Sequence, residues 1–238
     1  MMLRAATFVA ALVLALNAAA QTRITRPIHL IVPYVQGGGT DVLSRLLAPY
    51  IAEEFGQQVL VENRAGGGST IGTQQVARAA PDGHTIGMID AAFVTNPSLM
   101  PKLPYDTAKD FVPVVFVATS PLVLIIHPAV PVTSVAELVA LAKAKPGQLT
   151  YGSAGNGTGV HLAAEQLRAA NRLVMTHVPY KGSGQALTEL AGGQTTMLFA
   201  TPSGAKPLVA AGRLRALAIT GAKRSATMPG TPTFAEAG

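Results

Sequence analysis

The residues of this sequence that could do chemistry gather in three glycine-rich turns. One turn reads QGGGTD at residues 36–41, a second reads RAGGGST at 64–70, and a third reads GSAGNGTGVH at 152–161. Each turn follows a short apolar run and precedes apolar residues at helical spacing, so its backbone N–H groups lie free at a helix start. Because such N–H groups attract anions, the turns predict an anion-binding site.

Each turn also carries a hydroxyl residue close to the predicted helix start, namely Thr40, Ser69 and Thr158. A hydroxyl oxygen in this position accepts a hydrogen bond from a backbone N–H of the first helical turn. We expect these residues to cap their helices. An ordinary capped helix start remains the alternative to anion binding at each turn.

The spacing of the glycines disfavours nucleotides as the anion. The dinucleotide fingerprint G-x-G-x-x-G is met by Gly37 and Gly39 but fails at Val42, and no Gly-Lys-Ser/Thr of a phosphate loop occurs in the chain. The formal net charge is +6, yet the sequence has no run of Lys and Arg and no Trp. Nucleic-acid binding is therefore also disfavoured, and a small carboxylate is the anion that we expect.

A serine nucleophile is the second chemistry that the third turn permits. Ser153 lies in YGSAG, one residue away from the G-x-S-x-G pattern, because position 151 is Tyr. His161 follows Thr158 within one helical turn, so a catalytic pair of Ser153 and His161 is conceivable. No third partner is marked in the sequence. The alternative is that Ser153 and Thr158 only cap the helix.

The sequence gives little support for a metal site or a bound cofactor. The five histidines are spread along the chain without an H-x-x-x-H motif, and the sequence has no cysteine. His161 and Glu165 lie one helical turn apart, a spacing that suits metal ligands or a merely local contact. We predict neither a metal site nor a cofactor.

The N-terminus has the pattern of an export signal. Arg4 precedes an apolar stretch over 5–16, and small residues at 18–20 follow. This order is typical of a secretory signal peptide. We expect residues 1–20 to be cleaved near Ala20 and the protein to reach the periplasm. A second apolar stretch, 111–132, contains four prolines, which favours buried strands over a membrane helix.

From residue 28 onward, short β-branched runs alternate with helical patterns, which predicts parallel α/β layers. Ser120-Pro121 is the predicted crossover between two lobes, so we expect lobe 1 over 21–120, lobe 2 over 121–220, and a return towards lobe 1 over 221–238. The predicted strands are IHLIV, VLVEN, HTIGMID, VPVVFVA, LVLIIH, LTYGS, MTHVPY, TTMLFA and LRALAIT, and the predicted helices cover 43–51, 70–80, 134–145, 160–170, 185–191 and 202–211.

Several of these stretches together resemble one family. PYVQGGGTDVLSR, VENRAGGGSTIGTQQVARAAPDGHTIG, NPSLMPKLPYDTAKDFVPV, YGSAGNGTGVHLAAE, HVPYKGSGQAL and GRLRALAITGAKRS are similar to the periplasmic solute-binding receptors of tripartite tricarboxylate transporters, the Bug-type receptors. The resemblance implies a two-lobed, type II periplasmic-binding fold, each lobe being a mixed sheet flanked by helices. It also implies a monomer that closes on a small carboxylate, namely a di- or tricarboxylate, an acidic amino acid or an aromatic acid, and passes it to membrane components of a transporter.

The resemblance carries site residues onto this chain. It implies that the carboxylate meets the backbone around Gly38 and Gly39, the hydroxyls of Ser153 and Thr158, and ordered water. Asp41 and His161 border the pocket, and Asp41 either caps its helix or contacts a donor group of the ligand. Residues 92–96 and 180–184 form the far end. The candidate ligand-binding residues are Gly37, Gly38, Gly39, Thr40, Asp41, Thr95, Ser153, Gly155, Asn156, Thr158 and His161.

The chain departs from the family pattern in three places. Gln36 precedes three glycines where relatives usually have Pro-Gly-Gly, and Ala200 stands where relatives often have Asp. The chain also ends before the long C-terminal segment that the resemblance predicts. Two other functions stay open at this stage: a periplasmic hydrolase that uses Ser153 and His161, and a receptor that serves a sensor kinase instead of a transporter.

Overall fold

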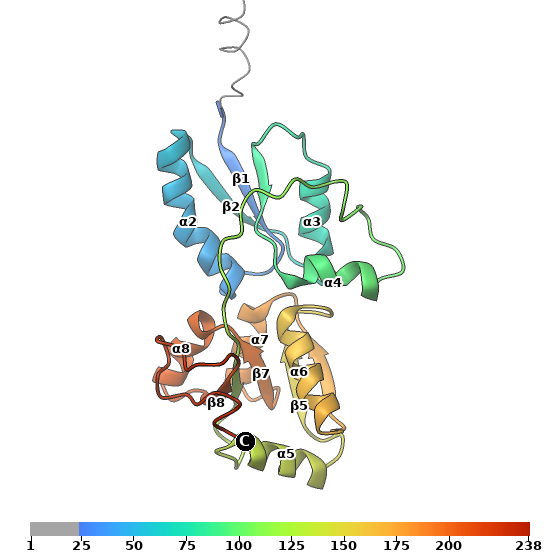
Figure 1. Cartoon of the computed structure of the whole chain (residues 1–238), viewed down its shortest axis with the longest axis vertical. Coiled ribbons are helices and arrows are strands. Elements are labelled where there is room, and N and C mark those ends of the chain that lie inside the picture. The colour runs from blue at the N-terminus through green and yellow to red at the C-terminus, as the bar shows by residue number, and fades with distance from the viewer. Residues whose placement is uncertain (1–23) are drawn as a thin grey trace, which may run out of the picture.

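The computed structural model describes residues 24–238. The predicted signal peptide, residues 1–20, lies outside the described residues. Figure 1 shows two lobes stacked along the long axis, joined by an extended segment. In residues 24–238, no helix has both the length and the apolar character that crossing a membrane requires.

Lobe 1 is a small parallel α/β layer. Its three strands lie in the order β2-β1-β3, and all pairs are parallel. Helix α2 packs on β1 and β2, whereas α3 packs on β1 and β3, and Figure 1 shows these helices on opposite sides of the sheet. The elements are β1 (Ile28–Val32), α2 (Gly39–Phe55), β2 (Val59–Asn63), α3 (Thr70–Ala77), β3 (Thr85–Gly87) and α4 (Ala91–Leu99).

Lobe 2 is a five-stranded mixed sheet in the order β6-β5-β7-β4-β8. Strand β5 is parallel to β6 and β7, whereas β4 is antiparallel to β7 and β8. The elements are β4 (Val123–Ile126), α5 (Val135–Ala144), β5 (Thr150–Ser153), α6 (Gly159–Ala170), β6 (Thr176–Pro179), α7 (Ser183–Ala191), β7 (Met197–Ala200), α8 (Pro202–Ala210) and β8 (Arg215–Ile219). The predicted α/β fold with sheets flanked by helices is confirmed. The sheet of lobe 2 is mixed as expected, but the described sheet of lobe 1 is entirely parallel, because helical crossovers follow each of its first two strands.

Strand β4 shows why lobe 2 needs helices on both faces. All four of its residues are fully buried. Leu124 and Ile126 contribute to the core cluster beneath α5 and α6, and Val123 and Ile125 contribute to the cluster beneath α7 and α8. Side chains alternate across a strand, so an unbroken apolar run requires cover on each face.

The predicted strand VPVVFVA, residues 112–118, is wrong. The structure shows no strand there, and Val112, Val114 and Phe116 are exposed. The β-branched residues favour an extended chain, but a strand also needs a partner, and no described strand pairs with this segment. Pro113 additionally removes one backbone donor. The segment instead belongs to the connection that joins α4 to β4 between the lobes (Figure 1).

The predicted strand HTIGMID is shorter than expected, because regular pairing covers only Thr85–Gly87. Its end leads directly to Asp90, the N-cap of α4. We propose the lobe boundary at Ser120-Pro121, inside the connection between α4 and β4.

Candidate functional site

The loops that follow the parallel strands of both sheets meet where the lobes touch. This is the edge at which open α/β sheets bind ligands, because helix starts converge there. Two of the contacts between the lobes involve the glycine turns. We call the contact of residues 35–39 with 181–184 and Thr201 the α2–α7 junction, and the contact of 66–69 and 95–99 with 155–157 the α4–α6 junction.

The α2–α7 junction is made of glycine backbone that packs on backbone and on a few side chains. Val35 N–H donates to the carbonyl oxygen of Lys181 at 3.2 Å. Gly184 packs so closely on the carbonyl of Gln36 that any Cβ there would overlap it, and a Cβ on Gly39 would lie 2.8 Å from the hydroxyl oxygen of Thr201. The glycines therefore allow the lobes to approach more closely than side chains would permit.

A recess of about 520 Å³ lies beside the α2–α7 junction. Residues of both lobes line it, among them Gln36 and Asn63 from lobe 1 and Gln185 and Thr188 from lobe 2. Gln36, which departs from the family pattern, thus lies at the boundary between the lobes.

The α4–α6 junction uses side chains as well as backbone. Thr95 Oγ1 donates to the carbonyl oxygen of Gly157 at 2.8 Å across the cleft. Gly68 packs against Asn156, so a Cβ on Gly68 would lie 2.6 Å from the Asn156 carbonyl oxygen. The lobes are thus in direct contact at both junctions.

This geometry changes the expected pairing of the turns. The turn at 36–41 faces residues 181–184 and Thr201, whereas the turn at 152–161 faces 66–69 and α4. The predicted site residues are therefore split into two groups. Gly37, Gly38 and Gly39 belong to the first junction; Thr95, Gly155 and Asn156 belong to the second, together with Gly157.

Asp41 anchors the first turn from inside helix α2. The residue is 4% exposed, and its carboxylate accepts from Gly37 N–H at 3.0 Å, Asn63 Nδ2 at 2.9 Å and Arg45 Nε at 3.1 Å. Burial opposes the charge of this carboxyl, but the bonds from Gly37, Arg45 and Asn63 outweigh it and lower the pKa of Asp41. These donors occupy both carboxylate oxygens.

The predicted hydroxyl caps are wrong. Helices α2, α3 and α6 have no side-chain cap hydrogen bond. Thr158 Oγ1 donates to the Gly155 carbonyl at 2.7 Å instead, and Ser69 adopts a left-handed conformation at the start of α3. The N-cap of α2 is Gly38 and not Thr40, which lies inside the first turn of the helix.

Because the hydroxyls do not cap, backbone donors remain unclaimed. Within residues 24–238, the N–H groups of Gly38, Gly39 and Thr40 at the start of α2 have no acceptor, and those of Gly159 and Val160 at the start of α6 have none. Each helix start therefore presents donors and a partial positive charge at the edge where the lobes meet.

Ser153 pairs with His177, not with His161. Ser153 is fully buried, its Oγ lies 2.6 Å from His177 Nε2, and it accepts from Gly155 N–H at 3.1 Å. His161 Nδ1 accepts from Gly157 N–H at 3.2 Å. The predicted pair is wrong because strand β6 lies beside β5 and brings His177 next to the turn. No sequence motif marks His177.

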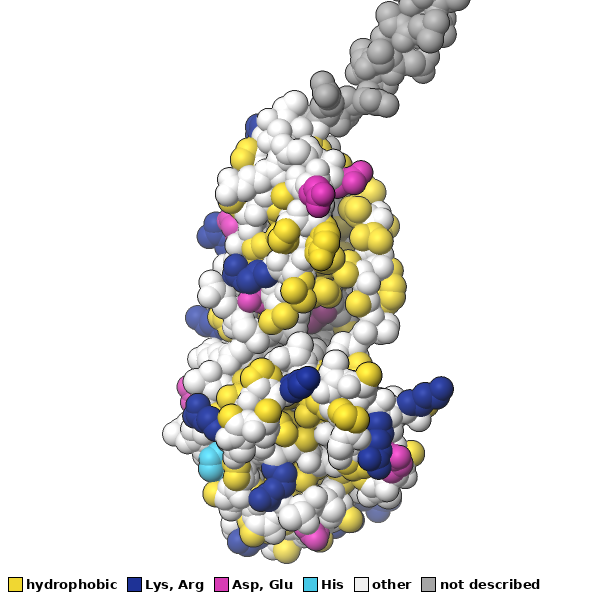
Figure 2. All heavy atoms as spheres, turned by 90° about the vertical axis from the view of Figure 1, so that its left-hand side faces the viewer, with side chains coloured by type: hydrophobic (Ala, Val, Ile, Leu, Met, Phe, Trp, Pro, Cys, Tyr) yellow, Lys and Arg dark blue, Asp and Glu magenta, His cyan; other side chains and the backbone are white. Residues whose placement is uncertain are grey.

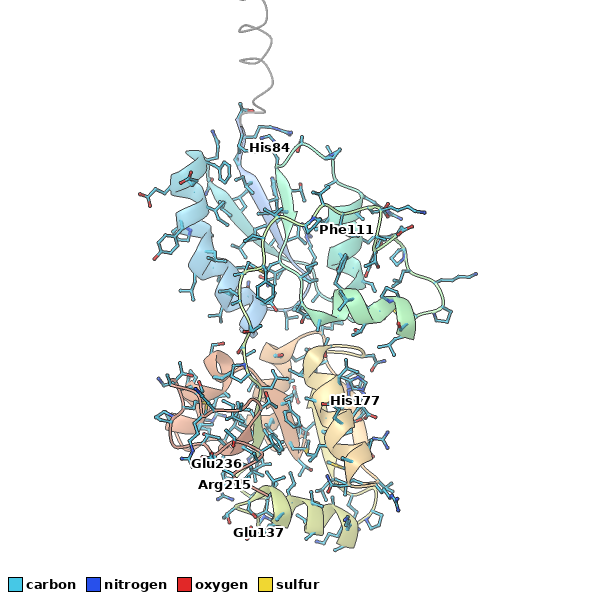
Figure 3. The ribbon with its side chains drawn as sticks, viewed as in Figure 1. His84, Phe111, Glu137, His177, Arg215 and Glu236 are labelled. Atoms are coloured by element: carbon cyan, nitrogen blue, oxygen red, sulfur yellow. The ribbon has the colours of Figure 1, made fainter. Side chains whose placement is uncertain are left out.

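The two histidines form a stack behind the turn. The ring of His177 lies 4.3 Å from His161 and 4.9 Å from Tyr151, measured between centroids, and Figure 3 shows His177 beside α6. Burial lowers the pKa of His177 to about 4 and also lowers the pKa of His161. Both rings are neutral at pH 7, so each can accept the hydrogen bond that holds the turn.

The carboxylate of Glu165 is hydrogen-bonded to protein side chains. It accepts from the Tyr151 hydroxyl and from Arg168 Nη2, the latter at 2.7 Å. Bonds from Arg168 and Tyr151 outweigh the burial of the carboxyl and lower the pKa of Glu165. In residues 24–238, no group of three or more carboxylate and imidazole side chains is placed to hold a metal ion.

Ser153 and His177 fix the backbone of the turn, and among the described residues no carboxylate or carbonyl accepts from the far nitrogen of His177 as a relay would require. What the cleft presents is two helix starts with free donors. Two lobes whose sheets share such a cleft define the class of periplasmic binding proteins.

The chain belongs to the tripartite tricarboxylate transporter family of receptors. The sequence model of this family matches residues 43–238. It is 38% identical to the protein BugT of Bordetella pertussis over 97% of this chain and 72% of BugT. It is 39% identical to a protein from the tcbD-tcbE intergenic region of Pseudomonas sp. strain P51, over 90% of this chain and 63% of that protein. The chain thus spans 63% to 72% of the length of these two relatives.

Solved structures agree with the fold. The periplasmic binding protein BugD superposes with a TM-score of 0.86 at 34% identity, covering 90% of this chain and 72% of BugD. R. palustris Rpa4515 with adipate gives a TM-score of 0.86 at 38% identity, over 90% of this chain and 72% of that one. MatC from Rhodopseudomonas palustris with bound malate gives 0.83 at 31% identity, over 90% and 74%.

Proposed function

We propose that this protein is a periplasmic receptor that captures a small carboxylate between its lobes for a tripartite tricarboxylate transporter. The observation that carries the proposal is the pair of helix starts at α2 and α6, whose N–H groups are unclaimed at the contact edge of the lobes. The solved relatives Rpa4515 and MatC hold adipate and malate, which supports a carboxylate as the ligand.

The free energies of these interactions are consistent with reversible binding of a carboxylate. An anion at a helix N-terminus is stabilised by about 0.3 to 1 kcal/mol, and by up to about 2 kcal/mol where it is partly buried. Each hydrogen bond to a charged group contributes about 1.5 to 3 kcal/mol. Three or four such bonds are sufficient for the roughly 8 kcal/mol of micromolar binding after ordering costs are subtracted.

Lobe closure is the working motion of the proposal. The glycines at both junctions let the lobes approach closely, and we infer that closing the lobes on a ligand would shield it from water. We propose that the closed form is what the membrane components recognise in the periplasm. We propose that the ligand accepts hydrogen bonds from the free N–H groups around Gly38, Gly39 and Gly159.

The test is a thermal-shift screen of the purified chain against mono-, di- and tricarboxylates, followed by calorimetry on each acid that stabilises it. We expect at least one acid to bind with micromolar affinity and to raise the melting temperature. If no acid stabilises the chain, the proposal fails. Ester turnover that disappears in Ser153→Ala would instead support a hydrolase.

A further inference from the structure

The turn between β5 and α6, residues 154–158, supports both a contact between the lobes and the proposed ligand donors. The carbonyl oxygen of Gly157 accepts from Thr95 of lobe 1 at 2.8 Å. The free N–H groups of Gly159 and Val160 follow directly after the turn. Because one short turn carries both features, the groups that hold it from inside lobe 2 determine whether the site keeps its shape.

Ser153 and His177 hold the start of the turn. The Ser153 hydroxyl oxygen accepts from Gly155 N–H at 3.1 Å and lies 2.6 Å from His177 Nε2. Ser153 is fully buried, and no other acceptor among the described residues reaches its hydroxyl hydrogen. A neutral imidazole accepts this hydrogen at Nε2, whereas an imidazolium would leave it without an acceptor.

His161 holds the end of the turn in the same way. Its Nδ1 accepts from Gly157 N–H at 3.2 Å, so this nitrogen carries no proton. A proton there would set two N–H donors against each other and deprive Gly157 of its acceptor. Two neutral imidazoles thus fix the two ends of the turn.

The two rings are close enough for a proton on one to affect the other. The ring centroids of His161 and His177 lie 4.3 Å apart, and Tyr151 stacks on His177 (Figure 3 labels His177). A positive charge on one imidazole disfavours a charge on the other at this distance. Burial lowers the pKa of both rings, so the described form takes up a proton only in acid.

The groups around the stack do little to stabilise an imidazolium. Burial is the larger influence on the pKa of His161 and outweighs the opposing effect of Glu165. Both oxygens of Glu165 are already hydrogen-bonded, one of them to Tyr151 and both to Arg168. The titratable residues on the elements around the stack are Tyr151 of β5, Glu165 and Arg168 of α6, Tyr180 and Lys181 after β6, and Asp90 at the N-cap of α4; β7 has none.

We infer that His161 and His177 are positioning residues that link ligand affinity to pH, because the turn keeps its ligand-binding shape only while both rings are neutral. The inference rests on the proposed function and adds its regulation. In the open receptor the turn is free to rearrange around an imidazolium, whereas closure fixes it through Thr95. Since linkage is reciprocal, binding of the ligand expels a proton wherever the stack holds one.

Calorimetry between pH 7.5 and pH 5.0 tests the inference with malate and adipate, and with every other acid that the screen finds. Affinity for the parent is expected to fall about 5- to 10-fold over this range, beyond the loss that protonation of the acid itself causes. Titrations at pH 5.0 in buffers of different ionisation enthalpy count the protons released on binding. Melting temperatures at each pH check that the protein is folded.

Two conservative variants keep the acceptors but do not titrate. The amide oxygen of His161→Asn can accept from Gly157 N–H, and that of His177→Gln can accept from the Ser153 hydroxyl. Each is expected to bind within about 3-fold of the parent at pH 7.5 and to lose less affinity in acid. The double variant is expected to show only the loss caused by the acid itself. His161→Ala, which removes the acceptor, is expected to bind about 5-fold weaker or worse even at pH 7.5.

His127→Asn is the matched control. Its Nδ1 also accepts a backbone N–H, from Ala129 at 3.2 Å, but it follows the end of β4 that pairs with the start of β7, away from the cleft. This variant is expected to keep the pH dependence of the parent. If the parent shows no excess loss of affinity, or if the conservative variants keep that loss, the inference is overturned and the receptor function stands. If no acid binds at any pH, both fall.

Discussion

Both junctions bring the lobes into contact, but they do so with different chemical groups. The α2–α7 junction combines glycine backbone, the main-chain hydrogen bond from Val35 N–H to Lys181, and packing of glycines on side chains such as Thr201. The α4–α6 junction adds a side-chain bond from Thr95 and an amide, Asn96, with one free oxygen. The first junction depends mainly on how closely glycine backbone can approach, whereas the second also depends on a hydrogen bond from a side chain.

The surfaces of the lobes differ as well. Figure 2 shows that basic side chains are more prominent than acidic ones on the visible face of lobe 2, whereas lobe 1 shows broad apolar areas there. Among its exposed apolar residues are Leu46, Tyr50 and Phe55 of α2. The core of lobe 2, by contrast, is covered on both faces of its sheet.

Gly184→Ala is expected to break the α2–α7 junction and to have the largest effect. The new Cβ overlaps the Gln36 carbonyl, and such overpacking costs about 1 to 3 kcal/mol, or about 5- to 150-fold in ligand affinity. Alanine favours a helix over glycine by about 1 kcal/mol, so the separate lobes should not be weakened. X-ray scattering is expected to show a larger radius of gyration.

The matched control is Gly230→Ala, because no atom lies within 4 Å of a Cβ at that position. It is expected to leave affinity and radius unchanged. A Gly184→Ala protein as compact and as tight-binding as the parent would show that the close contact plays no part in closure.

Asp41→Ala is expected to loosen the turn of the same junction from within lobe 1. It leaves Gly37 N–H and the Asn63 amide without their acceptor, which costs about 1 to 3 kcal/mol of unfolding free energy. Urea titration measures the loss. Glu53→Ala, on an exposed part of α2, is the control, and equal midpoints for the two variants would contradict the anchoring role.

Thr95→Val is expected to weaken the α4–α6 junction by less. It removes the hydroxyl that donates to Gly157, and a single hydrogen bond contributes about 0.5 to 1.5 kcal/mol, so affinity should fall about 2- to 10-fold. Thr70→Val removes a hydroxyl that donates to Gly67 within lobe 1 and should leave affinity unchanged. Calorimetry compares them, and equal affinities would argue against a bond formed on closure.

Lowering the pH is expected to reduce the free energy of unfolding through the histidine stack behind the α4–α6 junction. The effect is expected to be smallest near neutral pH. The unfolded chain gains protons below the ordinary imidazole pKa of about 6.5, whereas burial keeps the pKa of His177 at about 4. Protons then favour the unfolded state, so the free energy of unfolding falls as the pH drops from about 6.5 to about 4.

His177→Gln removes one of the buried imidazoles and is expected to flatten this pH dependence. His127→Gln, in the loop after β4, serves as the control. Urea titrations from pH 7.5 to pH 4.5 measure both variants, and a parent protein whose stability does not change over this range would refute the prediction.

Much of the fold follows from local sequence. The alternation of β-branched runs and helical stripes predicts most of the strands and helices, because these patterns depend on neighbours along the chain. Ser134 and Glu137 mark the start of α5, and the Ser134 hydroxyl does accept from Glu137 N–H. The same local logic fails at 112–118, where the residues favour a strand but no partner strand is present.

The sequence by itself determined that this chain has glycine turns at helix starts, with free N–H groups that suit an anion. Only the tertiary structure decided which turns meet, because that depends on the order of the strands and on how one lobe lies on the other. The pairing of Ser153 with His177 arises from β6 lying beside β5. The unpaired Oδ1 of Asn96 is enclosed by groups of both lobes, among them Gly157, so no local sequence pattern could mark it.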